Sequence, residues 1–414
     1  MKIQLRFGMH KDIEVIHQAR DLIDGLVIPM HILAHQTAST AAFICSLPSH
    51  EYVIDPMTWI LQNPRERHRR DDGSLRPSVG KWCDALHADL RKTLSTGVRG
   101  APLTSSELPD LKACCEGNFR FQTETVNVGH IDPRAKKYLD RYGMTLATRP
   151  RCVLSPYYQF QEVGDIWYTT TLEAAKLTQA IDPSANVAPV IMCSSTALNA
   201  AAAVRIASDF GTFKRCFVWI ESLSQGAANS GEIKRVIELV SALAARGVAV
   251  ETLYGGFMMM LMEYRGMVAI SHGILYTQDK ASEQVPGGGA VPERYYIPAF
   301  HDFRSLSQAN LILKKHPELA GGTPTAESVM SGDPDRIYMF ASRPELLRRH
   351  FLEARRRECQ TLASTKLEDV LRRLRDTYGK YHDSVSKLPN PDAVVTGGEQ
   401  KGLDYLMSWV NAFS

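Results

Sequence analysis

Several short motifs that would point to a particular chemistry are absent from this sequence. It contains no CxxC pair, no P-loop, no GxGxxG after an apolar run, and no HExxH or His-x-His motif. Eight scattered cysteines argue against a zinc ribbon or a disulfide framework, and several lie in apolar runs, where a reduced thiol acts as a small core residue. We therefore expect no cofactor and no metal, although a metal site assembled across strands from Asp55, Glu221 and His272 stays open.

Long apolar stretches and a strong net charge are also missing. No window approaches the ~20 apolar residues that span a bilayer, and the opening MKIQLRFGMHKDIEV lacks the apolar core of a signal peptide. We expect a cytoplasmic protein with no membrane partner. The net charge of +3, from 48 basic and 45 acidic residues, is too balanced to indicate a nucleic-acid binder, so local clusters would have to carry that function.

The sequence does contain short apolar runs, each followed by a polar or glycine stop. Most lack polar alternation, which is typical of strands buried on both faces. Between them lie helix-like segments, of which residues 230–247 are the clearest, with Ser230 as a possible cap and Gly247 as a stop. Eight strand–helix units predict a (β/α)8 TIM-type barrel, and an open doubly wound sheet is the main alternative. The predicted strands are residues 25–33, 50–59, 151–160, 186–195, 215–224, 247–256, 266–275 and 294–303.

Two parts of the chain do not follow this repeat. Residues 61–150 are polar and rich in turn formers. We interpret them either as an insertion after the second strand, with residues 119–127 as a candidate extra strand, or as a solvated loop with a few satellite helices. Residues 341–414 have a helical pattern dense in arginine, which predicts a C-terminal helical appendage. The barrel itself then comprises residues 1–60 and 151–340.

The carboxyl ends of parallel barrel strands converge on one mouth, so polar residues at those ends are the candidates for chemistry. Carboxylates and imidazoles in an apolar setting suit acid–base catalysis. The predicted catalytic residues are Asp55, Glu221 and His272. The predicted substrate contacts are Tyr157, Gln159, Ser194, Tyr254, Gly255, Gly256, His301 and Asp302, with Ser195 and either His31 or His35 also at the mouth.

Each candidate has a structural alternative. Asp55 precedes a proline and could cap a helix, Glu221 could form a buried ion pair, and His272 could be a satisfied core histidine. The Gly255–Gly256 pair either admits a ligand or makes a turn. Residues 258–262, MMMLM, are better explained as a buried helix face, and residues 286–292, PGGGAVP, as a lid or a linker.

Two basic clusters are candidates for phosphate contact, because the planar guanidinium binds two oxygens. The first comprises Arg65, Arg67, Arg69 and Arg70. The second, in residues 348–375, is better explained as a solvated helix face balanced by Glu353, Glu358 and Asp369.

Two motifs resemble a known family. YVIDPMTW (52–59) and VETLYGGFM (250–258) are similar to the base-recognising aspartate and the glycine pair of the tRNA-guanine transglycosylase superfamily, which are (β/α)8 barrels. The sequence departs from that family because Asp55 is followed by Pro-Met-Thr instead of Ser-Gly-Gly, the CxCxxC zinc element is missing, and Ser271-His272 stand where its nucleophilic aspartate would be sought. The resemblance therefore implies the fold more than the activity.

These observations predict an enzyme that cleaves or transfers at an N-glycosidic bond of a nucleotide or nucleic acid. One of Asp55 and Glu221 would stabilise or attack the sugar cation while the other handles protons, and His272 would assist the leaving group. Tyr157 and Tyr254 would stack a base. The alternatives are another carboxylate-based hydrolase, of glycosides or phosphodiesters, and a non-catalytic barrel that binds protein partners through its C-terminal helices.

Overall fold

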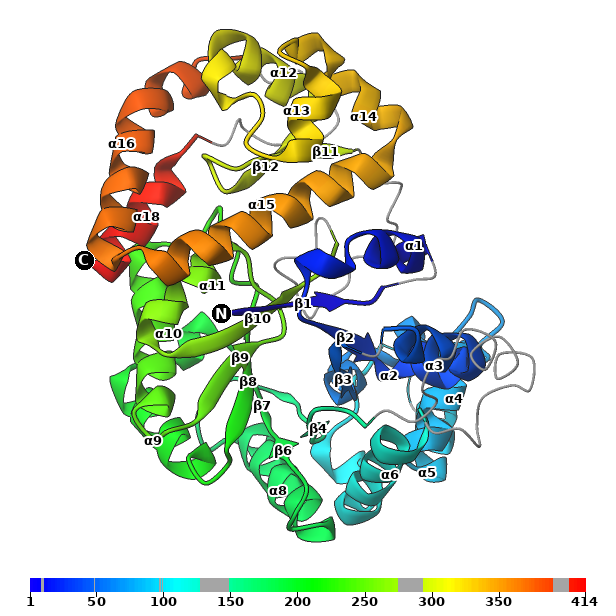
Figure 1. Ribbon diagram of the computed structural model, residues 1–414. Helices are drawn as coiled ribbons and strands as arrows, with labels where there is room; N and C mark the ends of the chain where they lie inside the picture. The colour runs from blue at the N-terminus through cyan, green and yellow to red at the C-terminus, as the bar shows by residue number, and fades with distance from the viewer. Residues whose placement is uncertain are drawn as a thin grey trace.

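The computed structural model describes residues 1–8, 11–47, 49–96, 98, 100–126, 149–274, 293–389 and 402–414. Its main feature is an eight-stranded parallel sheet that curls into a half-barrel (Figure 1). From edge to edge the strands are β3 (Glu51–Asp55), β2 (Gly25–Pro29), β1 (Lys2–Arg6), β10 (Met267–His272), β9 (Ala249–Thr252), β8 (Arg215–Glu221), β7 (Val190–Ser194) and β5 (Gln159–Phe160). The predicted α/β class is confirmed.

The sheet has eight strands, as predicted, but one of them is not among the predicted strands. Seven of the predicted runs contribute strands to this sheet, while the eighth strand is β1, which the sequence did not predict. The run 294–303 instead forms an antiparallel hairpin of β11 (Arg294–Ile297) and β12 (Asp302–Ser305), outside the sheet. Pro298 lies at the turn of this hairpin, where its missing backbone N–H does no harm to the pairing.

The predicted closed ring is not found, because the ladder of hydrogen bonds does not continue from β3 to β5. Prolines 156 and 189 each divide a strand, which leaves the short pieces β4 (Val153–Leu154) and β6 (Val187–Ala188) paired with each other. At this gap in the ladder, side chains form hydrogen bonds with backbone groups that no neighbouring strand pairs. The hydroxyl of Thr58 bonds both backbone groups of Tyr157, at 2.6 and 2.7 Å. The amide of Gln62 does the same for Gln159, at 2.8 and 2.6 Å.

Helices cover the outer surface of the curled sheet (Figure 1). The segment predicted as an extra strand, residues 119–127, is helical as far as Glu124, and Asp110 caps that helix by accepting from the backbone N–H of Lys112. The helices of this part are α1 (Lys11–Gln18), α2 (Met30–His35), α3 (Thr37–Cys45), α4 (Pro77–Leu86), α5 (Ala88–Thr96), α6 (Leu111–Glu124), α8 (Ile166–Ile181), α9 (Ala200–Phe210), α10 (Ser230–Ala244) and α11 (Phe257–Met260).

The clearest predicted helix is confirmed as α10. Its cap is Asn229 rather than Ser230, and Asn229 and Glu232 form a reciprocal capping box. Its stripe of Val236, Leu239, Val240 and Leu243 is buried. The methionine-rich segment is buried as well, as a helix face, and all eight cysteines are buried and free.

The C-terminal helices predicted from the sequence are present. Helix α15 (Pro344–Ser364) runs between the sheet and the β11–β12 hairpin, so it is a central element rather than a peripheral one (Figure 1). The other helices of this part are α12 (Leu306–Lys315), α13 (Pro324–Met330), α14 (Met339–Ser342), α16 (Leu367–Ser386) and α18 (Asp404–Phe413). No helix in the described ranges combines the length and the apolar character needed to cross a bilayer.

Candidate functional site

Strand β8 shows how side chains reach the concave face of the sheet. Successive side chains of a strand point to opposite faces. Phe217 and Trp219 belong to the cluster inside the half-barrel, whereas Val218 and Ile220 pack against the outer helices. The same alternation places Glu221, the last residue of β8, on the concave face at the carboxyl end of the strands. Ser194 of β7 pairs in register with it.

A cavity of about 760 Å³ opens at this edge of the sheet, and we call it the rim groove. It includes three of the predicted mouth residues, Gln159, Ser194 and Glu221. Its other lining residues come from the segments that follow β3, β5, β7 and β8, including the first turn of α8, and from the segment near Pro102. They are Trp59, Gln62, Asn63, Pro64, Pro102, Leu103, Gln161, Trp167, Thr196 and Ser222.

The backbone is strained where β8 enters the rim groove. Ser222 has a φ of 57°, in the left-handed region that residues other than glycine rarely adopt. This conformation lets the Ser222 hydroxyl donate to Oε1 of Glu221 at 2.5 Å. Such strain costs on the order of 1–3 kcal/mol and clusters at functional sites. It therefore supports Glu221 as the functional carboxylate of the groove.

Aromatic rings form the floor and one side of the groove. The ring of Trp59 meets that of Trp219 edge-on at a centroid distance of 4.9 Å, and Trp219 contacts Tyr254 at 4.7 Å. On the side, Trp167 lies 4.9 Å from Tyr158. Trp59 is 1% exposed, so the half-buried Trp167 offers the accessible indole surface. An indole beside amide and carboxylate groups is suited to a polar ring, which can be stacked and hydrogen-bonded together.

Asp55 lies beneath this aromatic floor and is fully buried. Its carboxylate accepts hydrogen bonds from the Arg6 guanidinium, from the Tyr157 hydroxyl at 2.8 Å and from the Met57 backbone at 2.9 Å. The Arg6 guanidinium also lies over the Tyr254 ring, 4.6 Å from its centroid. Asp55 is therefore neutralised by a neighbouring cation and does not line the rim groove.

Electrostatics fix the protonation of this buried cluster. Burial alone would lower the pKa of Arg6, but the adjacent Tyr254 and Asp55 raise it above its usual value, so the guanidinium stays charged. Burial raises the pKa of Tyr157 and of Tyr254, which keeps both phenols protonated. Both tyrosines were predicted to stack a base. The structure places them in the core beside Asp55, where the Tyr157 hydroxyl donates to Asp55 and the Tyr254 ring contacts Trp219 and Arg6.

His272 lies on the opposite side of the sheet from the rim groove. Its ring packs edge-on against Phe351 of α15 at 5.2 Å, and Nδ1 bonds the Gly273 carbonyl at 2.7 Å. Burial and the charge of Arg355 lower its pKa to about 3. His301 and Asp302 belong to the β11–β12 hairpin, where His301 contacts Glu358 and Asp302 contacts Arg304. The predicted single cavity shared by Asp55, Glu221 and His272 is therefore not formed.

The glycine pair has a packing explanation. A Cβ atom on Gly255 would lie 2.7 Å from Cβ of Met259, so the turn of α11 can approach β9 only if this residue has no side chain. Gly256 precedes the first residue of that helix.

The first basic cluster is largely committed to the protein itself. Arg65 is buried and bonds Glu107 at 2.5 Å, and Arg69 is buried and donates to the Leu94 carbonyl. Arg67 is half-buried, and Arg70 is exposed. Phosphate binding by this cluster stays a prediction, with Arg70 its most accessible member.

The remaining mouth candidates have local partners. Nδ1 of His31 lies 3.1 Å from the Met57 sulfur, His35 is exposed, and the Ser195 hydroxyl donates to Glu232 at 3.0 Å. Within the described ranges, no three histidine, cysteine or carboxylate side chains are grouped as metal ligands would be.

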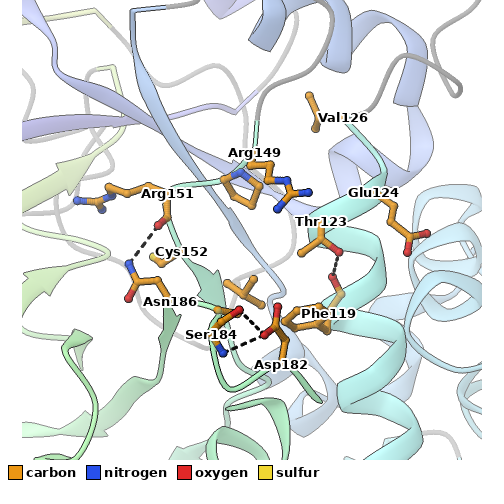
Figure 2. Close-up of a pocket in the computed structure, with 13 residues that line it drawn as sticks. Phe119, Thr123, Glu124, Val126, Arg149, Arg151, Cys152, Asp182, Ser184 and Asn186 are labelled. Carbon is orange, nitrogen blue, oxygen red and sulfur yellow. Dashed lines mark hydrogen bonds between the residues drawn. The ribbon is translucent and has the colours of Figure 1, made fainter. Parts of the chain in front are cut away.

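A second large cavity, of about 620 Å³, lies at the amino ends of β4 and β6 (Figure 2). Two of its polar side chains bond other lining residues: Asn186 donates to the Arg151 carbonyl at 3.1 Å, and the Ser184 hydroxyl donates to Asp182 at 2.6 Å. Parallel α/β sheets bind ligands at the carboxyl ends of their strands. The rim groove is therefore the better candidate.

Comparisons with known proteins give no independent assignment, since no family model and no curated protein matches the chain. The sequence did not single out Trp59, Gln62, Asn63 or Trp167 as site residues. Their one signal is position: Trp59 ends the predicted strand 50–59, Gln62 and Asn63 follow it closely, and Trp167 comes after the predicted strand 151–160.

Proposed function

We propose that the rim groove binds a nucleoside unit and that Glu221 acts at its N-glycosidic bond. The observation that carries the proposal is the position of Glu221, on the concave face at the end of β8, facing a groove that Trp59 and Trp167 line. The half-buried indole of Trp167 would stack the base, and the amides of Gln159 and Asn63 would bond its polar edge.

A single carboxylate is sufficient for this reaction. When the C1′–N bond breaks, its electron pair leaves with the base nitrogen, which takes up a proton from solvent water, and positive charge develops on the sugar. A carboxylate fixed beside that charge stabilises the transition state. The oxygen of water, or of an acceptor alcohol, then bonds to C1′ and loses its proton. Glu221 would first stabilise the cation, then accept this proton and release it to solvent, which returns the proton that the base took up.

The glycoside-hydrolase alternative has less support. That chemistry normally uses two carboxyl groups about 5–9.5 Å apart across the scissile bond. Of the described residues that line the rim groove, Glu221 is the single carboxylate, and Asp55 is buried and paired with Arg6. The presence of a single carboxylate also favours one other candidate function, in which the groove binds a nucleoside without cleaving it.

The experiment measures release of free base from a panel of nucleosides and nucleotides by chromatography, together with binding by titration calorimetry. We expect Glu221→Gln to retain binding and to lower the release rate about 10²- to 10⁴-fold. Glu238→Gln, an exposed residue of α10, is the matched control and should release base at the wild-type rate.

Binding without release by the wild type would favour the binding function. Absence of nucleoside binding, or unchanged release by Glu221→Gln, would contradict the proposal.

A further inference from the structure

A cavity separate from the rim groove lies between α11, the β11–β12 turn and the helices α15 and α16. It measures about 280 Å³, and we call it the α15–α16 cavity. Its walls are mostly apolar, with Phe257, Leu362 and Leu374 among them. In Figure 1, α16 begins beside one end of α15. An apolar cavity that carries a few fixed polar groups is the usual form of a small-molecule site.

The polar wall of this cavity is the pair His301–Glu358. Glu358 is buried, and both its oxygens are occupied: Oε1 accepts from the Tyr296 hydroxyl at 2.7 Å and from Nδ1 of His301 at 2.6 Å, and Oε2 accepts from Arg355 at 2.8 Å. Burial would raise the pKa of Glu358, but Arg355 and His301 lower it, so the group is a carboxylate and can only accept. Nδ1 of His301 therefore carries a proton, which leaves Nε2 for a ligand.

The ring of His301 is fixed in the cavity wall. His301 is the last residue of the β11–β12 turn, and its φ of 54° is in the left-handed region, which histidine adopts more readily than most side chains. Its ring stacks on Phe257 at a centroid distance of 3.4 Å and an angle of 7°. Both rings line the cavity, so the position of the imidazole is set before a ligand binds.

The charges around the cavity favour an anion. The titratable groups that line it are His301, Glu358, Arg357 and Arg373. Arg355 balances Glu358 from within the core, whereas Arg357 and Arg373 are exposed at the opening. One nitrogen of Arg357, Nη1, donates to the Gly322 carbonyl. A guanidinium binds a carboxylate through two parallel hydrogen bonds.

We propose that the α15–α16 cavity binds a small amphipathic carboxylate. Its apolar part would lie against Phe257 and Leu374, and its carboxylate would contact Arg357, Arg373 and Nε2 of His301. The volume falls just below the ~300–1,000 Å³ of typical ligand pockets, so the ligand has a short chain or a single ring.

Titration of the full chain with hexanoate, hexanol and hexylammonium tests the proposal. Hexanoate should bind saturably and at least 10-fold more tightly than either of the other two, which share its chain and differ in charge. The double variant R357Q/R373Q should bind hexanoate at least 10-fold more weakly than the wild type. R372Q, which removes an exposed charge from α16 without lining the cavity, should bind as the wild type does.

A third variant, Thr361→Phe, fills the cavity and should abolish binding, while circular dichroism checks that every variant folds. Glu221→Gln should leave hexanoate binding unchanged, which separates this site from the rim groove. Three results would each overturn the proposal: no saturable hexanoate binding, equal binding of hexanol, or unchanged binding by R357Q/R373Q.

Discussion

His350 gives a sharp test of the buried polar contacts around α15. Its ring is fully buried and stacks on Tyr295 at 4.4 Å. Nε2 lies 2.7 Å from the Tyr296 carbonyl, which can only accept, so Nε2 carries the proton. Nδ1 then accepts from the Thr323 hydroxyl, also at 2.7 Å. Protonation of Nδ1 would break that bond and place a charge in the core.

Burial lowers the pKa of His350 from 6.5 to about 4, although the Tyr296 carbonyl partly opposes the shift. Above pH 6.5 both the folded and the unfolded chain carry a neutral imidazole. As the pH falls below 6.5, the His350 side chain takes up a proton in the unfolded chain, but in the folded chain it stays neutral until about pH 4. The free energy of unfolding therefore falls between these two pH values. From these two pKa values, His350 alone accounts for a loss of about 2 kcal/mol between pH 7 and pH 5.

The assay is urea unfolding at pH 7 and pH 5, followed by tryptophan fluorescence. The wild type should lose more than 2 kcal/mol, because the pKa values of the buried residues His68 and His272 are also lowered. His350→Gln should lose about 2 kcal/mol less than the wild type, whereas His35→Gln, an exposed histidine, should match it. An equal loss in the wild type and His350→Gln would refute the reasoning.

Three further substitutions test the packing of the fold, each by urea unfolding at pH 7. Glu251 is fully buried and bonds Arg151, Arg215 and Gln4, so Glu251→Gln should cost about 3–5 kcal/mol, while removal of the partly exposed Glu51 carboxylate should cost at most about 1. Gly255→Ala should cost about 1–3 kcal/mol, because the new Cβ meets Met259 at 2.7 Å. Gly379→Ala should instead stabilise by about 0.5–1 kcal/mol, because this position of α16 has open space around it. A cost for Gly379→Ala, or none for the other two, would contradict the packing described here.

The α/β class and seven of the eight sheet strands could be predicted from apolar runs, since strands buried on both faces carry a strong local signal. Strand β1 was missed because Lys2–Arg6 alternates: Ile3 and Leu5 face outward, whereas Gln4 and Arg6 point inward to Glu251 and Asp55. The inward polar residues are stabilised by Glu251 and Asp55, which are distant in sequence, so the local pattern does not show that these positions are buried.

Two segments were assigned to the wrong structure for a related reason. Residues 119–121, Phe-Arg-Phe, alternate as a strand would, but the i, i+4 pair Asn118 and Gln122 bonds the Leu154 backbone from one face of a helix. The run 294–303 is apolar because its hairpin packs against α15, where His350 and Phe351 contact it. In both cases tertiary contacts override the local pattern.

Some of the predicted site residues line the rim groove and others do not. Gln159, Ser194 and Glu221 were predicted from strand ends, and they do line one groove. Asp55 also ends a strand, but Arg6 and Tyr157 enclose it. His272 differs from its neighbour Ser271 by a single step of strand alternation, which turns it to the outer face. Position along a strand can be predicted from sequence more readily than the face a side chain takes.

Hydrogen–deuterium exchange with and without a saturating nucleoside tests most directly whether the rim groove is the ligand site. We expect slower exchange in residues 58–63, 194–197 and 221–224, which border the groove, and unchanged exchange in residues 151–154 and 184–187 at the amino ends of the strands. Slower exchange only in residues 151–154 and 184–187 would contradict the account. Slower exchange in residues 58–63 and 194–197 with no change in residues 221–224 would contradict it as well.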